Sequence, residues 1–208
     1  LRADLALVEA GLARSRSHAA TLIDAKRALV NGEAIRKPAQ IIAESASLTL
    51  LAAIDYVSRA GHKLAEALDQ FGELELVGKY CLDVGASTGG FTEVLLRRGA
   101  SSVVSIDVGH DQMVAELKDN PKVTCIEGFN ARQLSPETLA EAGVTKADFD
   151  IVVADLSFIS LTLVLEQILS VARGADLVLL IKPQFEVGRQ SLSANGIVND
   201  YRLRAEAI

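Results

Sequence analysis

Short apolar segments alternate with longer amphipathic ones from residue 80 onward, and this alternation restricts the fold more than any other feature of the sequence. The apolar segments lie at 80–84, 102–107, 122–126, 149–154 and 176–182. Apolar residues in the intervening segments recur at helical spacing. Strands that are apolar on both faces and are joined through helices form a parallel sheet covered on both sides. We therefore predict an α/β fold whose ligand crevice lies at the carboxyl ends of the strands, near the first one.

The start of the chain follows a different pattern, in which two helices precede a small β unit. Apolar spacing predicts a helix over about 5–12, and serine caps predict a second helix over about 15–26. A strand at 28–30 is followed by Asn31–Gly32, a typical hairpin turn, and a further short strand is expected at 47–51.

The formal charge is unevenly distributed along the chain. The net charge of −6 by itself argues against a nucleic-acid partner, because phosphates attract basic surfaces. Residues 1–63 carry +3, however, and residues 64–208 carry −9. This asymmetry indicates two parts with different partners. We predict two domains, at 1–51 and 58–208, joined by a linker at 52–57.

The composition excludes several classes of protein. An apolar share of 50% and a charged share of 23% are typical of globular domains and not of disordered or fibrous chains. The apolar runs are far shorter than the ~20 residues that span a bilayer, and the start does not resemble a secretory leader. Cys81, Cys125 and the three histidines lack the spacing of a disulfide framework or a metal site. We therefore expect a cytoplasmic protein with no metal and no membrane partner.

A glycine-containing turn follows the first predicted strand. Glycines let a backbone approach a ligand closely, and the start of the next helix offers unpaired N–H groups. The turn has neither the glycine spacing of a dinucleotide site nor the Gly-Lys-Ser/Thr of a phosphate loop, which disfavours a nicotinamide-dependent oxidoreductase. A carboxylate at the end of the second strand is able to accept both ribose hydroxyls of an adenosine. The predicted cofactor-binding residues are Asp83, Gly85, Ala86, Ser87, Thr88, Gly89, Gly90, Phe91, Asp107 and Asp155.

This combination resembles the S-adenosylmethionine site of Rossmann-like methyltransferases. An acidic site also suits a sulfonium cation better than a pyrophosphate. The alternative is that the glycines serve only to permit a tight turn.

Two polar side chains close later strands of the predicted sheet. Asp155 follows the fourth strand and Lys182 ends the fifth, so we expect both in the crevice beside the glycine turn. Lys63 opens the helix before the sheet and could reach the same place. For methyl transfer to a ribose hydroxyl, one desolvated lysine can act as a base, and the aspartate can orient it. The alternatives are a lysine snorkelling from the strand end at Lys182 and a solvated charge at Lys63.

Asp155-Leu156-Ser157-Phe158 also bears on the acceptor atom. Enzymes that methylate amino groups of bases commonly present an Asn- or Asp-Pro-Pro-aromatic turn at this place. The absence of tandem prolines favours a ribose oxygen over an exocyclic nitrogen.

Four motifs together resemble the TlyA/hemolysin A family. They are Ser58–Leu64 (SRAGHKL), Asp83–Thr92 (DVGASTGGFT), Val153–Ser160 (VADLSFIS) and Lys182–Glu186 (KPQFE). The resemblance implies a small α+β RNA-binding domain of the ribosomal-protein S-four type, followed by a class I methyltransferase domain of the FtsJ/RrmJ type. It also implies 2′-O-methylation of ribose in ribosomal RNA or ribosomal subunits, with S-adenosylmethionine as the donor.

The resemblance further implies a catalytic Lys-Asp-Lys-Glu tetrad, whose first three members match Lys63, Asp155 and Lys182. The Glu belongs on a later strand beyond Ile208. We therefore expect these residues to form a methyltransferase sheet that is truncated at its C-terminal end and that can be inactive by itself. A non-catalytic RNA-binding or ribosome-assembly factor remains the main alternative. The hemolysin name raises the further alternative of a cytolysin, but the predicted strands are too short and too apolar for a pore.

Basic residues lie on or beside the second predicted helix and the hairpin of the first domain. We expect them to follow RNA phosphates and to read shape more than sequence. A solvated helix face is the alternative, and a two-helix unit is also typical of DNA-binding helix-turn-helix proteins. The hairpin and the fused methyltransferase favour RNA. The predicted RNA-binding residues are Arg14, Arg16, Lys26, Arg27, Arg36, Lys37 and Arg59.

Overall fold

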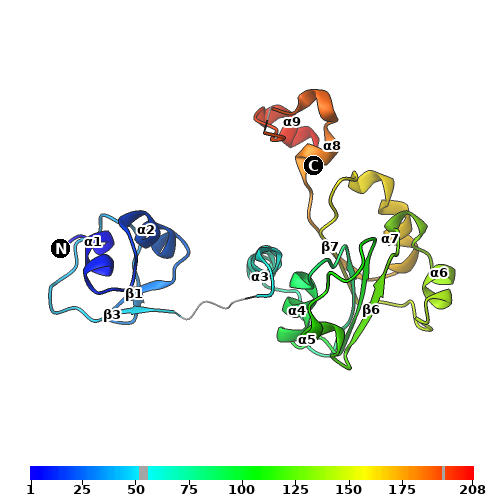
Figure 1. The fold of residues 1–208 in the computed structure, drawn as a ribbon, viewed down its shortest axis with the longest axis horizontal. Helices are drawn as coiled ribbons and strands as arrows, with labels where there is room; N and C mark the ends of the chain where they lie inside the picture. Colours follow the sequence, from blue (N-terminus) through cyan, green and yellow to red (C-terminus); the bar gives the residue numbers. More distant parts are fainter. Residues whose placement is uncertain (52–55, 194) are drawn as a thin grey trace. The chain divides into compact units, whose positions relative to one another are not determined.

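The computed structural model describes residues 1–51, 56–193 and 195–208. The chain forms two compact units, Leu1–Asp55 and Tyr56–Ile208, which are described separately below (Figure 1). Of the predicted linker, residues 52–55 lie outside the described part of the chain. Tyr56 packs against the core of the second unit, and the backbone N–H of Val57 donates to Glu93 Oε2 at 2.7 Å.

The first unit has two helices packed on a small antiparallel sheet. The Ser15 side chain caps the second helix by accepting a hydrogen bond from the backbone N–H of His18. Asn31 and Gly32 both have positive φ, as a tight hairpin requires. The sheet order is β2-β1-β3. The elements are α1 (Ala3–Glu9), α2 (Arg16–Asp24), β1 (Ala28–Val30), β2 (Glu33–Ala34) and β3 (Leu48–Leu50).

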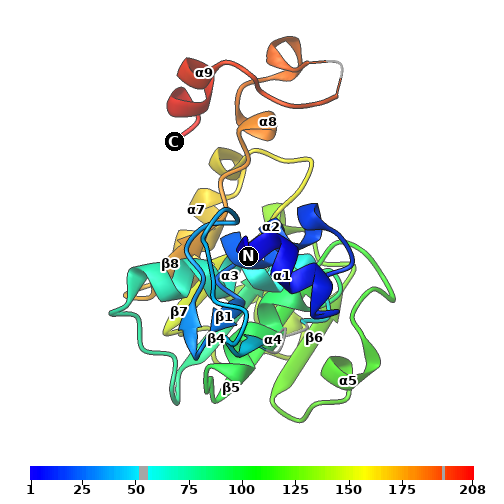
Figure 2. The ribbon, with the colours of Figure 1, turned by 90° about the vertical axis from the view of Figure 1, so that its left-hand side faces the viewer.

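The second unit is built on a five-stranded parallel sheet in the order β6-β5-β4-β7-β8, which Figure 2 shows across the unit. The predicted parallel α/β sheet is therefore confirmed. The first strand of the unit, β4, lies in the middle, so the connections leave it in opposite directions and open a crevice at its carboxyl end. The strands are β4 (Tyr80–Val84), β5 (Ser102–Asp107), β6 (Val123–Glu127), β7 (Ile151–Ala154) and β8 (Asp176–Leu179).

Helices cover both faces of this sheet. Residues of α3 and α4 pack against one face, which includes Cys81 and Val153. Residues of α6 and α7 pack against the other face, which includes Val84 and Val152. The helices are α3 (Arg59–Phe71), α4 (Gly90–Arg97), α5 (Ala115–Lys118), α6 (Pro136–Glu141), α7 (Leu165–Val171), α8 (Pro183–Glu186) and α9 (Tyr201–Glu206), with short 3-10 turns η1 (Ala131–Gln133), η2 (Leu161–Leu163) and η3 (Arg189–Ser191).

Two predicted elements differ from the structure. The last strand ends at Leu179 and not at Lys182, because the neighbouring β7 ends at Ala154 and leaves later residues without a strand to pair with. Lys182 instead precedes Pro183, which starts α8. The amphipathic segment between the strands at 102–107 and 122–126 forms only the short helix α5, which begins after Val114.

Candidate active site

The glycine turn connects the central strand β4 to α4. Gly85 and Gly89 have φ of +89° and +96°, a region that side chains with a Cβ rarely adopt. A Cβ added to Gly85 would lie 3.0 Å from the backbone oxygen of Asp155 and 3.1 Å from Leu156 Cδ2. The turn therefore passes directly over the segment that follows β7, as only a glycine permits.

Asp107 ends β5 and faces the same turn. Its Oδ2 accepts a hydrogen bond from the backbone N–H of Ser87 at 2.8 Å, and its Oδ1 accepts one from Gly109 at 2.7 Å. Each carboxylate oxygen keeps further acceptor capacity. Asp107 lines a cleft of about 510 Å³. The Gln112, Phe129 and Asn130 side chains, which the sequence did not single out, line it as well.

Asp83 lies beneath the turn. It lines neither this cleft nor a second cleft beside Lys63 and Asp155. Its side chain is fully buried, and its Oδ2 accepts a hydrogen bond from Thr92 Oγ1 at 2.6 Å. Thr92 Oγ1 also lies 2.7 Å from Ser105 Oγ. Asp83 Oδ1 has no hydrogen-bond partner among the described residues. Burial raises the pKa of the Asp83 carboxyl to about 7, so a substantial part of it is neutral near neutral pH.

The three predicted catalytic side chains converge beyond the carboxyl ends of β4 and β7. Lys182 Nζ lies 2.5 Å from Asp155 Oδ1, in the geometry of an ion pair and not of a directional hydrogen bond. Lys63 Nζ lies 3.6 Å from Asp155 Oδ2. Side-chain exposure is 16% for Lys182, 11% for Asp155 and 51% for Lys63. One carboxylate thus holds two ammonium groups, one enclosed and one open to solvent.

Ser157 is a further member of this cluster that the sequence did not single out as functional. Its hydroxyl oxygen accepts a hydrogen bond from Lys182 Nζ at 2.7 Å. In the sequence alone, a serine two residues after Asp155 looks like an ordinary turn residue. The contact arises only because the segment after β7 and the segment after β8 lie side by side, as the pair Ser160 and Glu186 also shows through a hydrogen bond.

A second cleft of about 470 Å³ also has Asp155 in its lining. Ser58, Arg59 and Lys63 from the start of α3 line it, together with Lys182. Both clefts share Gly85, Ser87, Asp155 and Ser157 as a common wall. The glycine turn lines both clefts, whereas Asp107 lines the first and the basic side chains line the second. The arrangement suits two ligands that meet at Asp155, one beside Asp107 and the other among the basic side chains.

Phe158 is an unusual feature of the first cleft. Its side chain is 92% exposed, and its φ of +66° is strained for a residue other than glycine. Its ring centroid lies 5.5 Å from that of Phe185. Phe158 belongs to the motif Val153–Ser160, but its sequence context predicted no role for it.

The remaining predicted site residues are distributed over both units. Ala86, Thr88, Gly90 and Phe91 lie in the glycine turn and the first turn of α4, as the sequence predicted. In the first unit, Arg16 pairs with Asp4, and Arg27 Nη2 donates to the backbone oxygen of Leu51 at 3.3 Å. The exposed basic residues of this unit are Arg14, Arg16, Lys26, Arg36 and Lys37.

Two other properties of the described residues bear on function. No group of three or more His, Cys, Asp or Glu side chains within residues 1–51, 56–193 and 195–208 is arranged to hold a metal ion. Among the helices in these same ranges, none combines the length and the apolar character needed to cross a membrane.

Comparison with protein families assigns a model to each unit. The model described as FtsJ-like methyltransferase matches residues 56–208, and the S4 domain model matches residues 1–47. Among curated proteins, the 16S/23S rRNA (cytidine-2′-O)-methyltransferase TlyA of Mycobacterium tuberculosis is 46% identical over 210 residues, which cover 100% of this chain and 76% of the relative. Hemolysin A of Brachyspira hyodysenteriae is 38% identical and is covered over 85% of its length, again with 100% of this chain.

Solved structures agree with this assignment. A protein from Streptococcus thermophilus, described as a candidate hemolysin, superposes with a TM-score of 0.69 at 35% identity, covering 100% of this chain and 74% of that one. A similarly described protein from Lactococcus lactis gives a TM-score of 0.66 at 38% identity, covering 74% of this chain and 71% of that one.

Proposed function

Because the chain belongs to the FtsJ-like methyltransferase family, we propose that it methylates a ribose 2′-hydroxyl of ribosomal RNA, with S-adenosylmethionine as the donor. The observation that carries the proposal is the convergence of Lys63, Asp155 and Lys182 on the wall shared by two clefts. The relative from Mycobacterium tuberculosis is named for 2′-O-methylation of rRNA, which supports the same reaction here. Such a reaction takes place in the cytoplasm, where ribosomal subunits are made.

The residues around the first cleft fit the proposed donor. S-adenosylmethionine supplies a methyl group activated by a sulfonium. The unfilled acceptor capacity of Asp107 suits the two ribose hydroxyls of an adenosine. The missing Cβ of Gly85 lets the turn lie against the segment after β7, which brings the turn close to Asp155.

The two lysines divide the work at the acceptor. A ribose hydroxyl is a poor nucleophile, so one lysine nitrogen, in its neutral form, accepts the hydroxyl proton as the oxygen attacks. The other lysine stays charged and holds the oxygen in place. Asp155 contacts both nitrogens, which limits their mutual repulsion and fixes their positions. Ser157 further restricts the orientation of Lys182.

The first unit is proposed to bind the RNA. An S4 domain model matches it, and its exposed arginines and lysines supply the charge that phosphates attract. In the second unit, Arg59 lines the second cleft and adds a guanidinium close to the reacting groups. RNA bound in this way brings its phosphates to the basic residues and one ribose to the lysine pair.

Transfer to isolated ribosomal subunits tests the proposal. Protein is incubated with purified small and large subunits and S-adenosylmethionine labelled in the methyl group, and the labelled nucleotide is mapped. We expect label on a ribose 2′-oxygen. Label on a base, or no label on the RNA of either subunit, would contradict the proposal.

Lys182→Ala separates catalysis from binding. We expect transfer to fall about 10²-fold or more, because one of the two lysines that act on the hydroxyl is lost. Donor binding, measured by calorimetry, should persist. Lys122→Ala removes an exposed lysine at the start of β6 and serves as the matched control, with transfer unchanged. A non-catalytic RNA-binding factor would show no difference between the two variants.

A further inference from the structure

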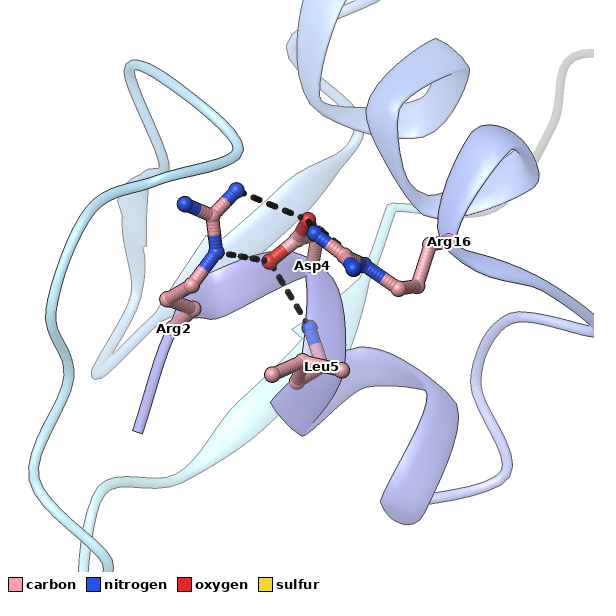
Figure 3. Close-up of polar contacts among 4 residues, drawn as sticks. All are labelled: Arg2, Asp4, Leu5 and Arg16. Atoms are coloured by element: carbon pink, nitrogen blue, oxygen red, sulfur yellow. Dashed lines mark hydrogen bonds and ion pairs between the residues drawn. The ribbon is translucent and has the colours of Figure 1, made fainter.

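Asp4 of the first unit contacts two arginines, Arg2 near it in the sequence and Arg16 at the start of α2 (Figure 3). The Arg2 guanidinium donates two hydrogen bonds to it, from Nε to Oδ1 and from Nη2 to Oδ2, both at 3.0 Å. Arg16, the first residue of α2, donates from Nε and Nη2 to Oδ2 at 3.1 and 2.9 Å. The backbone N–H of Leu5 completes the set at Oδ1.

The carboxylate is enclosed, but the arginines are not. The side chain of Asp4 is 5% exposed, whereas those of Arg2 and Arg16 are 42% and 58% exposed. Their hydrogen bonds hold the pKa of the Asp4 carboxyl well below its usual range, so the group stays an anion at neutral pH. Each guanidinium uses only its Nε and Nη2 on Asp4, and its other N–H groups are directed elsewhere.

The net charge of such a cluster attracts phosphates less strongly than two unpaired arginines would. The anion cancels one of the two positive charges, so the cluster carries +1 where the arginines without Asp4 would carry +2. The anion instead fixes the two planar guanidinium groups in one relative orientation before any ligand binds. Fixed forks lose little side-chain entropy when they bind the oxygens of successive phosphates.

We propose that Asp4 is a positioning residue that holds Arg2 and Arg16 as a paired guanidinium site for backbone phosphates of structured RNA. The inference rests on the proposed function, which makes RNA the ligand of this unit. Arg14, which is exposed and lies two residues before Arg16, extends the same basic surface. Arg2 thereby joins the candidate RNA-binding residues, although the sequence had not singled it out.

Asp4→Asn distinguishes positioning from charge, because the two predict opposite results. The variant makes the surface more positive by one unit, so charge alone predicts tighter RNA binding. Loss of positioning predicts weaker binding, by about fivefold or more, with a salt dependence shallower by about one phosphate contact. Full-length protein is titrated with purified large and small ribosomal subunits, without donor, between about 50 and 200 mM KCl.

Asp24→Asn is the matched control. Asp24 is an exposed residue at the end of α2 in the same unit, and the substitution changes the charge by the same amount. We expect unchanged or slightly tighter binding for this variant. Equal or tighter binding by a folded Asp4→Asn protein would overturn the proposal.

If Asp4→Asn fails to fold, the variants Arg2→Lys and Arg16→Lys test whether the paired guanidinium groups bind RNA. Each keeps the charge but loses the fork, so we expect each to weaken subunit binding about fivefold with little change in melting temperature. If both lower the melting temperature but bind subunits as the wild type does, the cluster only ties α1 to α2 and the proposal is wrong. A protein that binds subunits but transfers no methyl group to ribose would refute the proposed function alone, because these binding measurements do not depend on transfer.

Discussion

At the residue scale, the protonation state of the buried Asp83 affects the stability of the site. Its carboxyl group is enclosed between the sheet and α4 and accepts hydrogen bonds from Thr92. Desolvation outweighs these hydrogen bonds and favours the neutral acid. Ionisation of this buried group therefore costs stability in the folded protein.

The stability of the protein should therefore fall as the pH rises across the titration of Asp83. Its pKa is raised from 3.8 to about 7 on folding, so its contribution is complete below the unfolded value and is lost as the pH rises through the folded one. Asp83→Asn should show a smaller loss of unfolding free energy between pH ~5 and ~8, measured by urea denaturation. Equal losses in both proteins would refute the assignment. Asp4 and Glu127, whose pKa values are lowered, act only at more acidic pH.

Gly85 offers a second test at this scale. Gly85→Ala combines a positive φ with crowding against the Asp155 backbone, so we expect a loss of about 1–3 kcal/mol in stability. Donor affinity should fall about tenfold or more, measured by calorimetry. Gly143→Ala is the matched control, because Gly143 has φ of +91° but open space around it. It should lose stability by about 1 kcal/mol and keep its donor affinity. Equal donor affinity in both alanine variants would exclude a role for the close approach at Gly85.

Much of the candidate site could be predicted at the residue scale, for a physical reason. Asp107 and Asp155 follow apolar segments, and the carboxyl ends of parallel strands share one edge. The Asp4 cluster could not be predicted, since it joins residues on two helices whose packing the sequence does not reveal. The same limit applies to Ser157, whose partner Lys182 comes from another strand connection.

Among the elements, α3 connects the chain entering the second unit to the reacting groups. Ser58 caps it by accepting a hydrogen bond from the backbone N–H of Ala60 at 3.2 Å, and Lys63 lies little more than one turn later. The preceding Val57 is held by Glu93 of α4. The position of Lys63 therefore depends on how the first turn of α3 is fixed.

Ser58→Ala tests this dependence. Loss of the cap should lower stability by about 1 kcal/mol and reduce methyl transfer several-fold, because Lys63 is less well positioned. Ser135→Ala removes a comparable cap from α6, which lines neither of the two clefts. It should lower stability similarly and leave transfer unchanged. Parallel losses of transfer in both variants would point to general destabilisation instead.

Element boundaries were predicted less well than element order. The alternation of apolar and amphipathic segments specified the parallel sheet, because both of its faces must be buried. The end of β8 and the start of α5 depend on where neighbouring segments stop pairing or packing. Such information is tertiary, so periodicity within one segment does not contain it.

At the scale of the whole molecule, the chain has two units with two matched family models, and the charge differs between them: residues 1–55 carry +1 and residues 56–208 carry −7. The net charge of −6 concealed this division, because the acidic second unit outweighs the basic residues of the first. The S4 match covers residues 1–47 and the methyltransferase match begins at residue 56. In the proposed function, RNA binding and methyl transfer therefore belong to separate folded parts of one chain.

The wall shared by the two clefts has a kinetic consequence for the proposed reaction. Gly85, Ser87, Asp155 and Ser157 contribute to both clefts, while the other lining residues differ between them. We therefore expect donor and acceptor to bind together in a ternary complex, with direct transfer of the methyl group and no methylated enzyme intermediate.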